Sequence, residues 1–197
     1  MPESIDTLFG TTKMAEVFSL EAHVRGMLSF EAALARAEAR VGIIPEYAAH
    51  IIVSNCNADL FDVAVLYREA RTAGTPVIPL VRILTEKVGD GAKKFVHWGA
   101  TSQDVIDTAL VLQMRDGIDL LVGGLLAVCE ACEQLAEQHK STVMAGRTLL
   151  QQAVPITFGL KAGRWLAMTV RQVHALREHR KRSLVVQLGG ATGTLAS

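Results

Sequence analysis

The chain has 197 residues, of which half are apolar and 5% aromatic, and its 20 basic residues balance its 20 acidic residues. This length is sufficient to bury a core, and an apolar composition that is poor in aromatic residues suits packed helices better than a β-sandwich. A formal net charge of zero gives no electrostatic footprint for nucleic acid and no polybasic membrane signal, although it leaves room for a local cationic pocket.

The cysteines and the N-terminal sequence bear on the compartment. Cys56, Cys129 and Cys132 do not have the spacing of a disulfide scaffold, which favours a reducing environment. The first ten residues lack the basic segment and apolar run of a signal peptide. Charged residues interrupt every apolar run before the roughly 18 residues that a membrane span requires. We therefore expect a cytoplasmic protein that binds neither nucleic acid nor membranes.

The first hundred residues have the spacing of short packed helices. Apolar residues recur with helical periodicity from Lys13 to about Val41, where Gly42 and Pro45 predict the helix end. Further helices are predicted over 46–54, 59–73 and 77–88, separated by glycines and prolines. None of these segments alternates with the two-residue period of a half-buried strand. Residues 1–100 are therefore predicted to form a compact N-terminal helical domain.

Residues 101–197 have a different organisation and are predicted to form part of a long-helix bundle. A helix is expected from Ser102 to about His139, on the order of 55 Å long. An interrupting stretch over 141–154 follows, and Pro155 is expected to open a second long helix that runs to about Leu184. Two such helices cannot cover their own apolar faces, so further residues or other subunits must do so. The predicted fold class is all-α.

Two segments carry superficial motifs. The run Gln187–Ser197 is rich in glycine, but it lacks the lysine and the residue order of a phosphate-binding loop and follows no predicted strand. It is more typical of a turn that leads onward than of a natural C-terminus, so we expect a truncated chain. Cys129 and Cys132 form a CxxC in the middle of a predicted helix with no second pair, which favours small buried residues over a metal site.

The most informative segment is His97–Asp104, at the start of the first long helix. Thr101 as N-cap with Asp104 three residues later forms a capping box, which is sufficient to explain those two residues. A helix N-terminus with the hydroxyls of Thr101 and Ser102 is also suited to bind a carboxylate, and His97 can carry a proton or a positive charge near neutral pH. The two interpretations are compatible.

A second polar segment, Gly146–Gly159, lies between the two predicted long helices. Arg147 has the planar fork that grips a carboxylate, and Thr148 and Gln151 are neutral hydrogen-bonding groups. The alternative is an ordinary interhelical loop with a solvated arginine.

Three stretches in this order, HWGATSQDVIDTA, GRTLLQQAVPITFG and LGGATGT, resemble the signature regions of the fumarase/aspartase superfamily. The resemblance implies a small N-terminal helical domain, a bundle of very long helices, a homotetramer and a small polycarboxylate substrate, with no metal and no redox cofactor. The wording HWGATSQD is typical of the cycloisomerase branch, which closes 3-carboxy-cis,cis-muconate to a lactone in protocatechuate breakdown. Adenylosuccinate-type lyases of the superfamily carry a histidine where this chain has Leu149.

The resemblance also implies the site residues. His97, Ser102 and Arg147 are the expected catalytic residues, and the expected substrate-binding residues are Thr101, Ser102, Gln103, Arg147, Thr148 and Gln151. The third signature of the superfamily, a flexible catalytic loop, lies beyond this chain, so we expect the chain alone to be inactive. Two alternatives remain: a C–N lyase of the same superfamily, and a non-catalytic helical assembly module.

Overall fold

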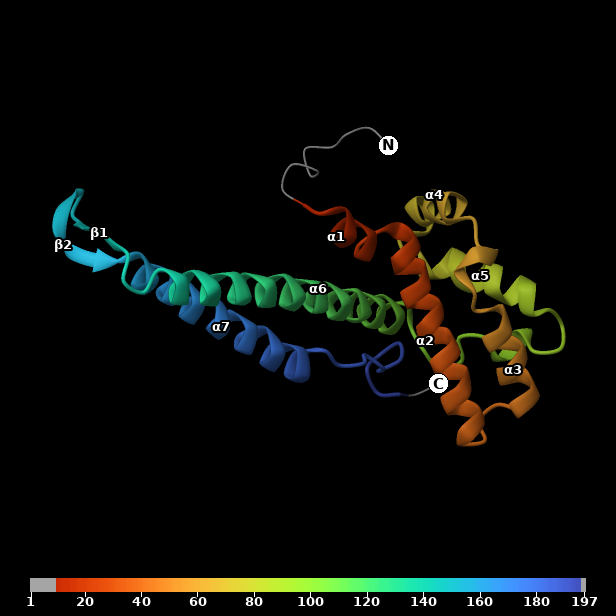
Figure 1. Ribbon diagram of the computed structural model, residues 1–197. Helices are drawn as coiled ribbons and strands as arrows, with labels where there is room; N and C mark the ends of the chain where they lie inside the picture. The colour runs from red at the N-terminus through yellow and green to blue at the C-terminus, as the bar shows by residue number, and fades with distance from the viewer. Residues whose placement is uncertain (1–9, 196–197) are drawn as a thin grey trace. The chain divides into compact units, whose positions relative to one another are not determined.

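The computed structural model describes residues 10–195, whose regular secondary structure is helical apart from one β-hairpin (Figure 1). The helices are α1 (Thr12–Val17), α2 (Leu20–Arg40), α3 (Glu46–Asn55), α4 (Val63–Ala73), α5 (Val77–Val88), α6 (Ser102–Gln138) and α7 (Phe158–Ser183), with single turns η2 (Ala58–Leu60) and η3 (Lys93–Phe95). The prediction of an all-α fold is confirmed. No helix within residues 10–195 combines the length and the apolarity that crossing a membrane would need.

The chain divides into two compact units. The first extends to Asp116 and includes the segment from Leu184 onward, and the second is Gly117–Ser183. Helix α6 runs from the first unit into the second. We propose a domain border between residues 100 and 101, because α6 begins immediately after this point, at Ser102.

The core of the first unit follows from the apolar spacing of its helices. In α2, Val24, Met27 and Leu28 are at most 1% exposed, which is the i, i+3, i+4 pattern of a buried helix face. Full burial of each such side chain stabilises the fold by about 1.5–3 kcal/mol. The core is completed by buried residues of α3, α4, α5 and α6, among them Ala48, Ile52, Leu66, Leu80, Leu84, Val105 and Ala109.

Two predictions in this domain were wrong, a helix without a break from Lys13 to Val41 and a helix start at residue 59, and side-chain caps explain both. The single helix predicted from Lys13 is broken after Val17, because Ser19 accepts a hydrogen bond from the amide of Ala22 (3.1 Å) and starts α2. Helix α4 begins at Val63 rather than at residue 59, because the Asp62 side chain accepts a hydrogen bond from the amide of Val65 (3.0 Å). In each case a local oxygen takes one of the free amides of a new first turn.

The second unit contains a hairpin where a loop was predicted. Strands β1 (Val143–Thr148) and β2 (Gln151–Thr157) pair antiparallel, with a bulge between Ala145 and Arg147. The prediction that Pro155 opens a helix is wrong, because Pro155 lies within β2, opposite Ala145. A two-stranded sheet consists only of edge strands, where proline is tolerated. Helix α7 begins at Phe158, and Thr157 accepts the Leu160 amide at 3.1 Å.

The start of α7 approaches the end of α6 too closely for a side chain at residue 159. The Gly159 amide donates to the carbonyl oxygen of His139 (2.9 Å). A Cβ at Gly159 would lie 2.6 Å from both the Ala136 oxygen and the Lys140 Cα, whereas a Cβ at Gly163 would meet no atom within 4 Å. The contact at Gly159 is with backbone, which cannot rotate aside.

These two glycines provide a matched pair of variants. We expect Gly159→Ala to destabilise the chain by about 1–3 kcal/mol, because the start of α7 must move away from the backbone at Ala136 and Lys140. Gly163→Ala should be neutral or stabilising by up to about 1 kcal/mol, because alanine is the better helix former. Urea unfolding followed by circular dichroism measures both, and equal effects of the two substitutions would contradict the close approach.

Candidate active site

The loop that leads into α6 is anchored to α2 by His97. Its backbone has a left-handed φ of 59°, which is uncommon for a residue other than glycine and needs support from its surroundings. That support is the His97 side chain, whose Nδ1 lies 2.6 Å from Oε1 of Glu31, a residue that is 1% exposed. The buried carboxylate of Glu31 thus fixes His97, which lies shortly before Thr101 in the sequence.

The environment of His97 is strongly acidic. Burial by itself lowers the pKa of His97, but the hydrogen bond and the charge of Glu31 outweigh it, so the net pKa is raised. Burial first, and then the charge of Glu31, raise the pKa of Glu38 to about 7. Oε2 of Glu31 and Oε2 of Glu38 are buried with no hydrogen-bond partner among the described residues. The folded state therefore favours a protonated His97 and holds the proton of Glu38 to near neutral pH.

Asp104 is the centre of a second buried polar cluster. It is 1% exposed, and its carboxylate accepts backbone amides from Thr101 (3.0 Å), Gly189 (2.8 Å) and Gly190 (3.0 Å). Burial raises the pKa of Asp104, but these bonds outweigh it and lower the pKa below its ordinary value. The bond from Thr101 is the Asp104 half of the predicted capping box, and the bonds from the glycines could not be read from local sequence.

The glycine-rich segment near the C-terminal end is held along the start of α6. Besides the Asp104 contacts, the Gln187 amide donates to Oγ1 of Thr108, which lies 3.2 Å from both the Gln187 amide nitrogen and its carbonyl oxygen. Gly190 has a φ of 71°, a left-handed conformation that glycine adopts without strain. Within the described chain, these glycine amides therefore bind a carboxylate of the chain itself.

The predicted polar residues at the start of α6 lie beside these clusters. Thr101 and Ser102 are half-buried, and Ser102 is the first helical residue. Gln103 is exposed, and its Nε2 donates to Oδ1 of Asp107 (2.7 Å). The first unit therefore brings His97, Thr101, Ser102 and Gln103 together on one loop and helix start.

The second group of predicted residues lies on the hairpin of the other unit. Arg147, Thr148 and Gln151 are exposed, and Thr148 faces Gln151 across the turn. The tip residues Leu149 and Leu150 have φ values of 44° and 63° and are 90% and 104% exposed. Two left-handed residues make the tight turn that suits the twist of a hairpin, although leucine adopts it at a cost of about 1–2 kcal/mol per residue.

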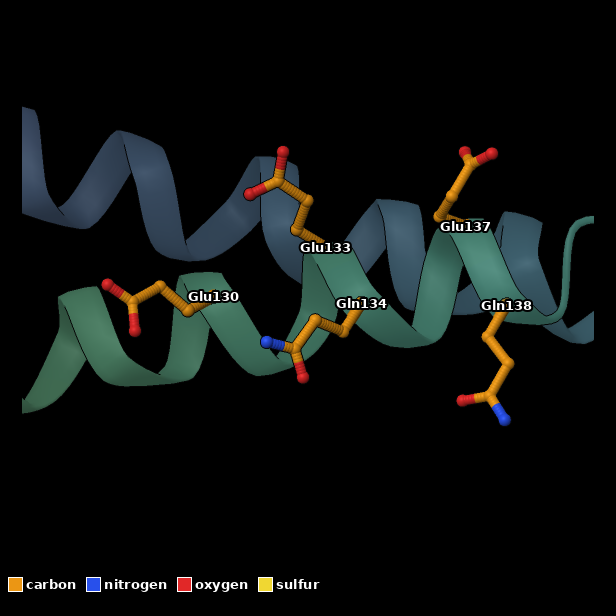
Figure 2. Close-up of a pocket in the computed structure, with 5 residues that line it drawn as sticks. All are labelled: Glu130, Glu133, Gln134, Glu137 and Gln138. Carbon is orange, nitrogen blue, oxygen red and sulfur yellow. The ribbon is translucent and has the colours of Figure 1, made fainter.

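A surface hollow on α6 contains none of the predicted residues. It measures about 520 Å³ and is lined by Glu130, Glu133, Gln134, Glu137 and Gln138. Figure 2 shows that all five side chains come from one helix, with the three carboxylates along its length. Exposed carboxylates repel an anionic ligand, so this hollow is unsuited to a polycarboxylate.

Metal ligation has no framework in the described chain. Among residues 10–195, no three His, Cys, Asp or Glu side chains are grouped to hold a metal ion. Cys129 and Cys132 lie within α6 as free thiols, with Cys132 buried.

The Asp104 cluster makes a testable prediction about the segment that it holds. Gly189 and Gly190 bond different oxygens of Asp104. Asp104→Asn replaces one accepting oxygen by a donor and leaves one of these two amides without an acceptor, so we expect a loss of about 2–3 kcal/mol in unfolding free energy. Amide hydrogen exchange at Gly189 and Gly190, measured by NMR, should accelerate. Asp107→Asn is the control, because within residues 10–195 Asp107 accepts a hydrogen bond from the exposed side chain of Gln103 rather than from either glycine. Unchanged exchange at both glycines in Asp104→Asn would contradict the role of Asp104.

The buried glutamate makes a prediction about pH. The pKa of Glu38 is about 7 in the folded chain and 4.5 ordinarily. The folded state holds this proton more tightly, so the associated stability is complete below about pH 4.5 and is lost as pH rises through about 7. Glu38→Gln stays uncharged, and it should exceed the parent in stability by about 1–3 kcal/mol at about pH 8.

Urea titrations at about pH 5 and about pH 8 measure this difference. The raised pKa of His97 gives a slope of the same sign in both proteins, so the variant should retain a smaller slope. Glu130→Gln is the exposed control. A parent whose stability does not fall over this range would contradict the burial of a proton on Glu38.

The sequence and the fold are similar to those of known enzymes. A family model described as "Lyase" matches residues 9–197. A 3-carboxy-cis,cis-muconate cycloisomerase of Pseudomonas aeruginosa is 46% identical over 98% of this chain, which spans 42% of that protein. Trans-aconitate decarboxylase 1 of Mycosarcoma maydis is 42% identical over 98% of this chain, which spans 39% of that protein.

Among solved structures, the 3-carboxy-cis,cis-muconate lactonizing enzyme of Pseudomonas putida matches with a TM-score of 0.92 at 44% identity, over 97% of this chain and 44% of that one. This chain thus spans less than half the length of these relatives. With a family model that matches almost its entire length, the chain belongs to the lyase family of the fumarase/aspartase superfamily.

Proposed function

We propose that the protein containing this chain is an enzyme that closes 3-carboxy-cis,cis-muconate to a γ-lactone. The P. aeruginosa and P. putida relatives are named for this substrate, and the M. maydis relative is named for trans-aconitate. Both compounds are unsaturated tricarboxylates. The substrate class that these names share is a small acid with three carboxylates beside a double bond.

The reaction requires charge stabilisation and one proton. A carboxylate oxygen of the substrate adds to a conjugated double bond of the same molecule, and a C–O bond forms. The π electrons move to the adjacent carbon, where a neighbouring carboxylate shares the negative charge. That carbon then takes one proton, so the trianion becomes the dianion of the lactone. The enzyme must place cations and hydrogen-bond donors where the charge develops and must supply one acid.

The observation that carries this choice is Leu149 at the tip of the hairpin. It follows Thr148 directly and is 90% exposed, with a side chain that cannot donate a proton. Release of an amine requires protonation of the leaving nitrogen, whereas a carboxylate with an ordinary pKa near 4 enters or leaves without a proton. Leu149 therefore supports a carboxylate as the entering group over a C–N lyase.

We assign roles to the predicted site residues on the same basis. Arg147 neutralises substrate charge with its guanidinium fork, and Thr148 and Gln151 beside it on the hairpin donate hydrogen bonds. Thr101, Ser102 and Gln103 bind a substrate carboxylate at the start of α6. His97, whose pKa is raised through its bond to Glu31, adds positive charge near Thr101 and Ser102 and is the candidate for proton transfer.

The proposal concerns a protein longer than this chain. The chain spans 42% of the P. aeruginosa relative, and the superfamily resemblance implies a third catalytic region beyond Ser197 and a homotetramer. We propose that the chain alone has little or no activity for this reason. Exposed apolar side chains of the second unit, among them Leu121, Val128, Trp165 and Met168, support coverage by further residues or subunits.

Ultraviolet absorbance of 3-carboxy-cis,cis-muconate tests the proposal. The conjugated-diene signal should disappear on addition of the protein from the uninterrupted reading frame and should persist with this chain alone. Loss of the signal with this chain would contradict the need for further residues. Persistence of the signal with a folded longer protein would overturn lactonisation, and release of fumarate from adenylosuccinate would then assign the C–N lyase reaction.

In the active longer protein, Arg147→Ala should reduce kcat/KM by about 100-fold or more, because a group that stabilises developing charge is lost. Its unfolding free energy should change by less than about 0.5 kcal/mol, because Arg147 is exposed in this chain. Arg171→Ala, which removes an exposed cation of α7, is the control. Unchanged kinetics would remove Arg147 from the site.

A further inference from the structure

A small pocket lies in the second unit where the hairpin meets the first turns of α7. Its volume is about 240 Å³, and it is lined by the cations Arg147, Lys161 and Arg164 and by the apolar side chains of Met144, Ile156 and Leu160. Drug-sized ligands occupy pockets of about 300–1,000 Å³, so this volume suits a smaller molecule. The pocket thus combines three positive charges with an apolar wall.

The cations of this pocket differ from others in the chain. Within residues 10–195, no carboxylate lies within ion-pair distance of Arg147, Lys161 or Arg164. By contrast, Arg180 near the end of α7 binds both carboxylate oxygens of Asp119, at 2.7 and 2.9 Å. The protein therefore supplies counter-charges at the end of α7 and leaves the pocket at its start positive.

The position of these cations on α7 adds to that imbalance. Lys161 and Arg164 lie within the first two turns of α7, and the first turn contains no acidic residue. The N-terminal end of a helix carries partial positive charge, which disfavours cations and favours anions. Lys161 is further held by the ring of Trp165, whose centroid lies 5.4 Å from Nζ. An anion in the pocket would relieve the repulsion among all these charges.

We propose that Arg147, Lys161 and Arg164 form one binding site for the carboxylates of a small polycarboxylate. The inference rests on the proposed function and adds Lys161 and Arg164 to its substrate-recognition residues. The two guanidinium groups accept carboxylates in bidentate fashion, and the lysine acts as a point charge. Met144, Ile156 and Leu160 contact the carbon skeleton, which favours an organic acid over an inorganic anion.

Calorimetric titration of this chain with tricarballylate, a saturated tricarboxylate that cannot form the lactone, tests the site. We expect saturable binding that weakens with added salt, and no binding of the neutral triamide of the same acid. Lys161→Gln and Arg164→Gln should each weaken the affinity by about 5- to 50-fold, because each removes a hydrogen bond between charged groups. Both side chains are exposed, so circular dichroism should show an unchanged fold.

Arg171→Gln is the matched control, because Arg171 is another exposed cation of α7 that does not line the pocket. Equal weakening by all three substitutions would mean that the affinity depends only on the net charge of the chain, and this would overturn the site. Failure of tricarballylate to bind would overturn it as well. Self-association of the chain that depends on Lys161 and Arg164, without tricarballylate binding, would overturn it in favour of an acidic surface of a second copy.

The binding test is independent of turnover. Tricarballylate binding without loss of the muconate diene signal by the longer protein would remove lactonisation and leave the anion site in place. Diene loss without any effect of Lys161→Gln or Arg164→Gln on tricarballylate binding would leave the reaction in place and overturn the site.

Discussion

The buried carboxylate of Asp104 holds the structure around the start of α6 together, because three backbone amides donate to it. One side chain that is 1% exposed joins the amide of Thr101 to the amides of Gly189 and Gly190. Removing a charge from water is costly unless hydrogen bonds replace its hydration. Three backbone donors do so here, and in return the carboxylate orders a glycine-rich segment that has no secondary structure of its own.

The buried polar cluster of His97, Glu31 and Glu38 places the loop before α6 in the same way. His97 adopts a left-handed backbone conformation and binds Glu31 at 2.6 Å, so the loop is tied to α2. Oε2 of Glu31 and Oε2 of Glu38 have no hydrogen-bond partner among residues 10–195. Such incompletely satisfied groups reduce stability, and strained, buried polar residues tend to gather at functional sites. This agrees with the proposed role of the loop in holding Thr101 and Ser102 for a substrate carboxylate.

The second unit has a surface that is unusual for an isolated soluble chain. Its hairpin tip exposes two leucines almost completely. The three cations around one pocket have no carboxylate within ion-pair distance among the described residues. Exposed apolar groups and uncompensated charge are each unfavourable in isolation. In our proposal, partner subunits cover the exposed apolar groups, and a bound polycarboxylate neutralises the positive charge of the pocket. Both features therefore agree with the proposed assignment to an oligomeric enzyme that recognises small anions.

The sequence by itself determined the helical class and the bounds of α5 and α6 to within a residue. It also determined the capping-box bond in which the Thr101 amide donates to the Asp104 carboxylate. These features depend on periodicity and on short-range hydrogen bonds, which local sequence encodes. Ser19 and Asp62 are cap signals of the same local kind, so the missed break before α2 and the misplaced start of α4 could also have been predicted from the sequence.

Only the tertiary structure decided the other features. The hairpin over residues 143–157 has Leu-Leu at its turn and a proline in its second strand, a pattern that no turn propensity favours. The amides of Gly189 and Gly190 donate to Asp104, and His97 binds Glu31, across long distances in the sequence. The pocket likewise groups Arg147 of the hairpin with Lys161 and Arg164 of α7. Such contacts form because packing brings the elements together and burial then requires each polar group to find a partner, and neither condition is written in the local sequence.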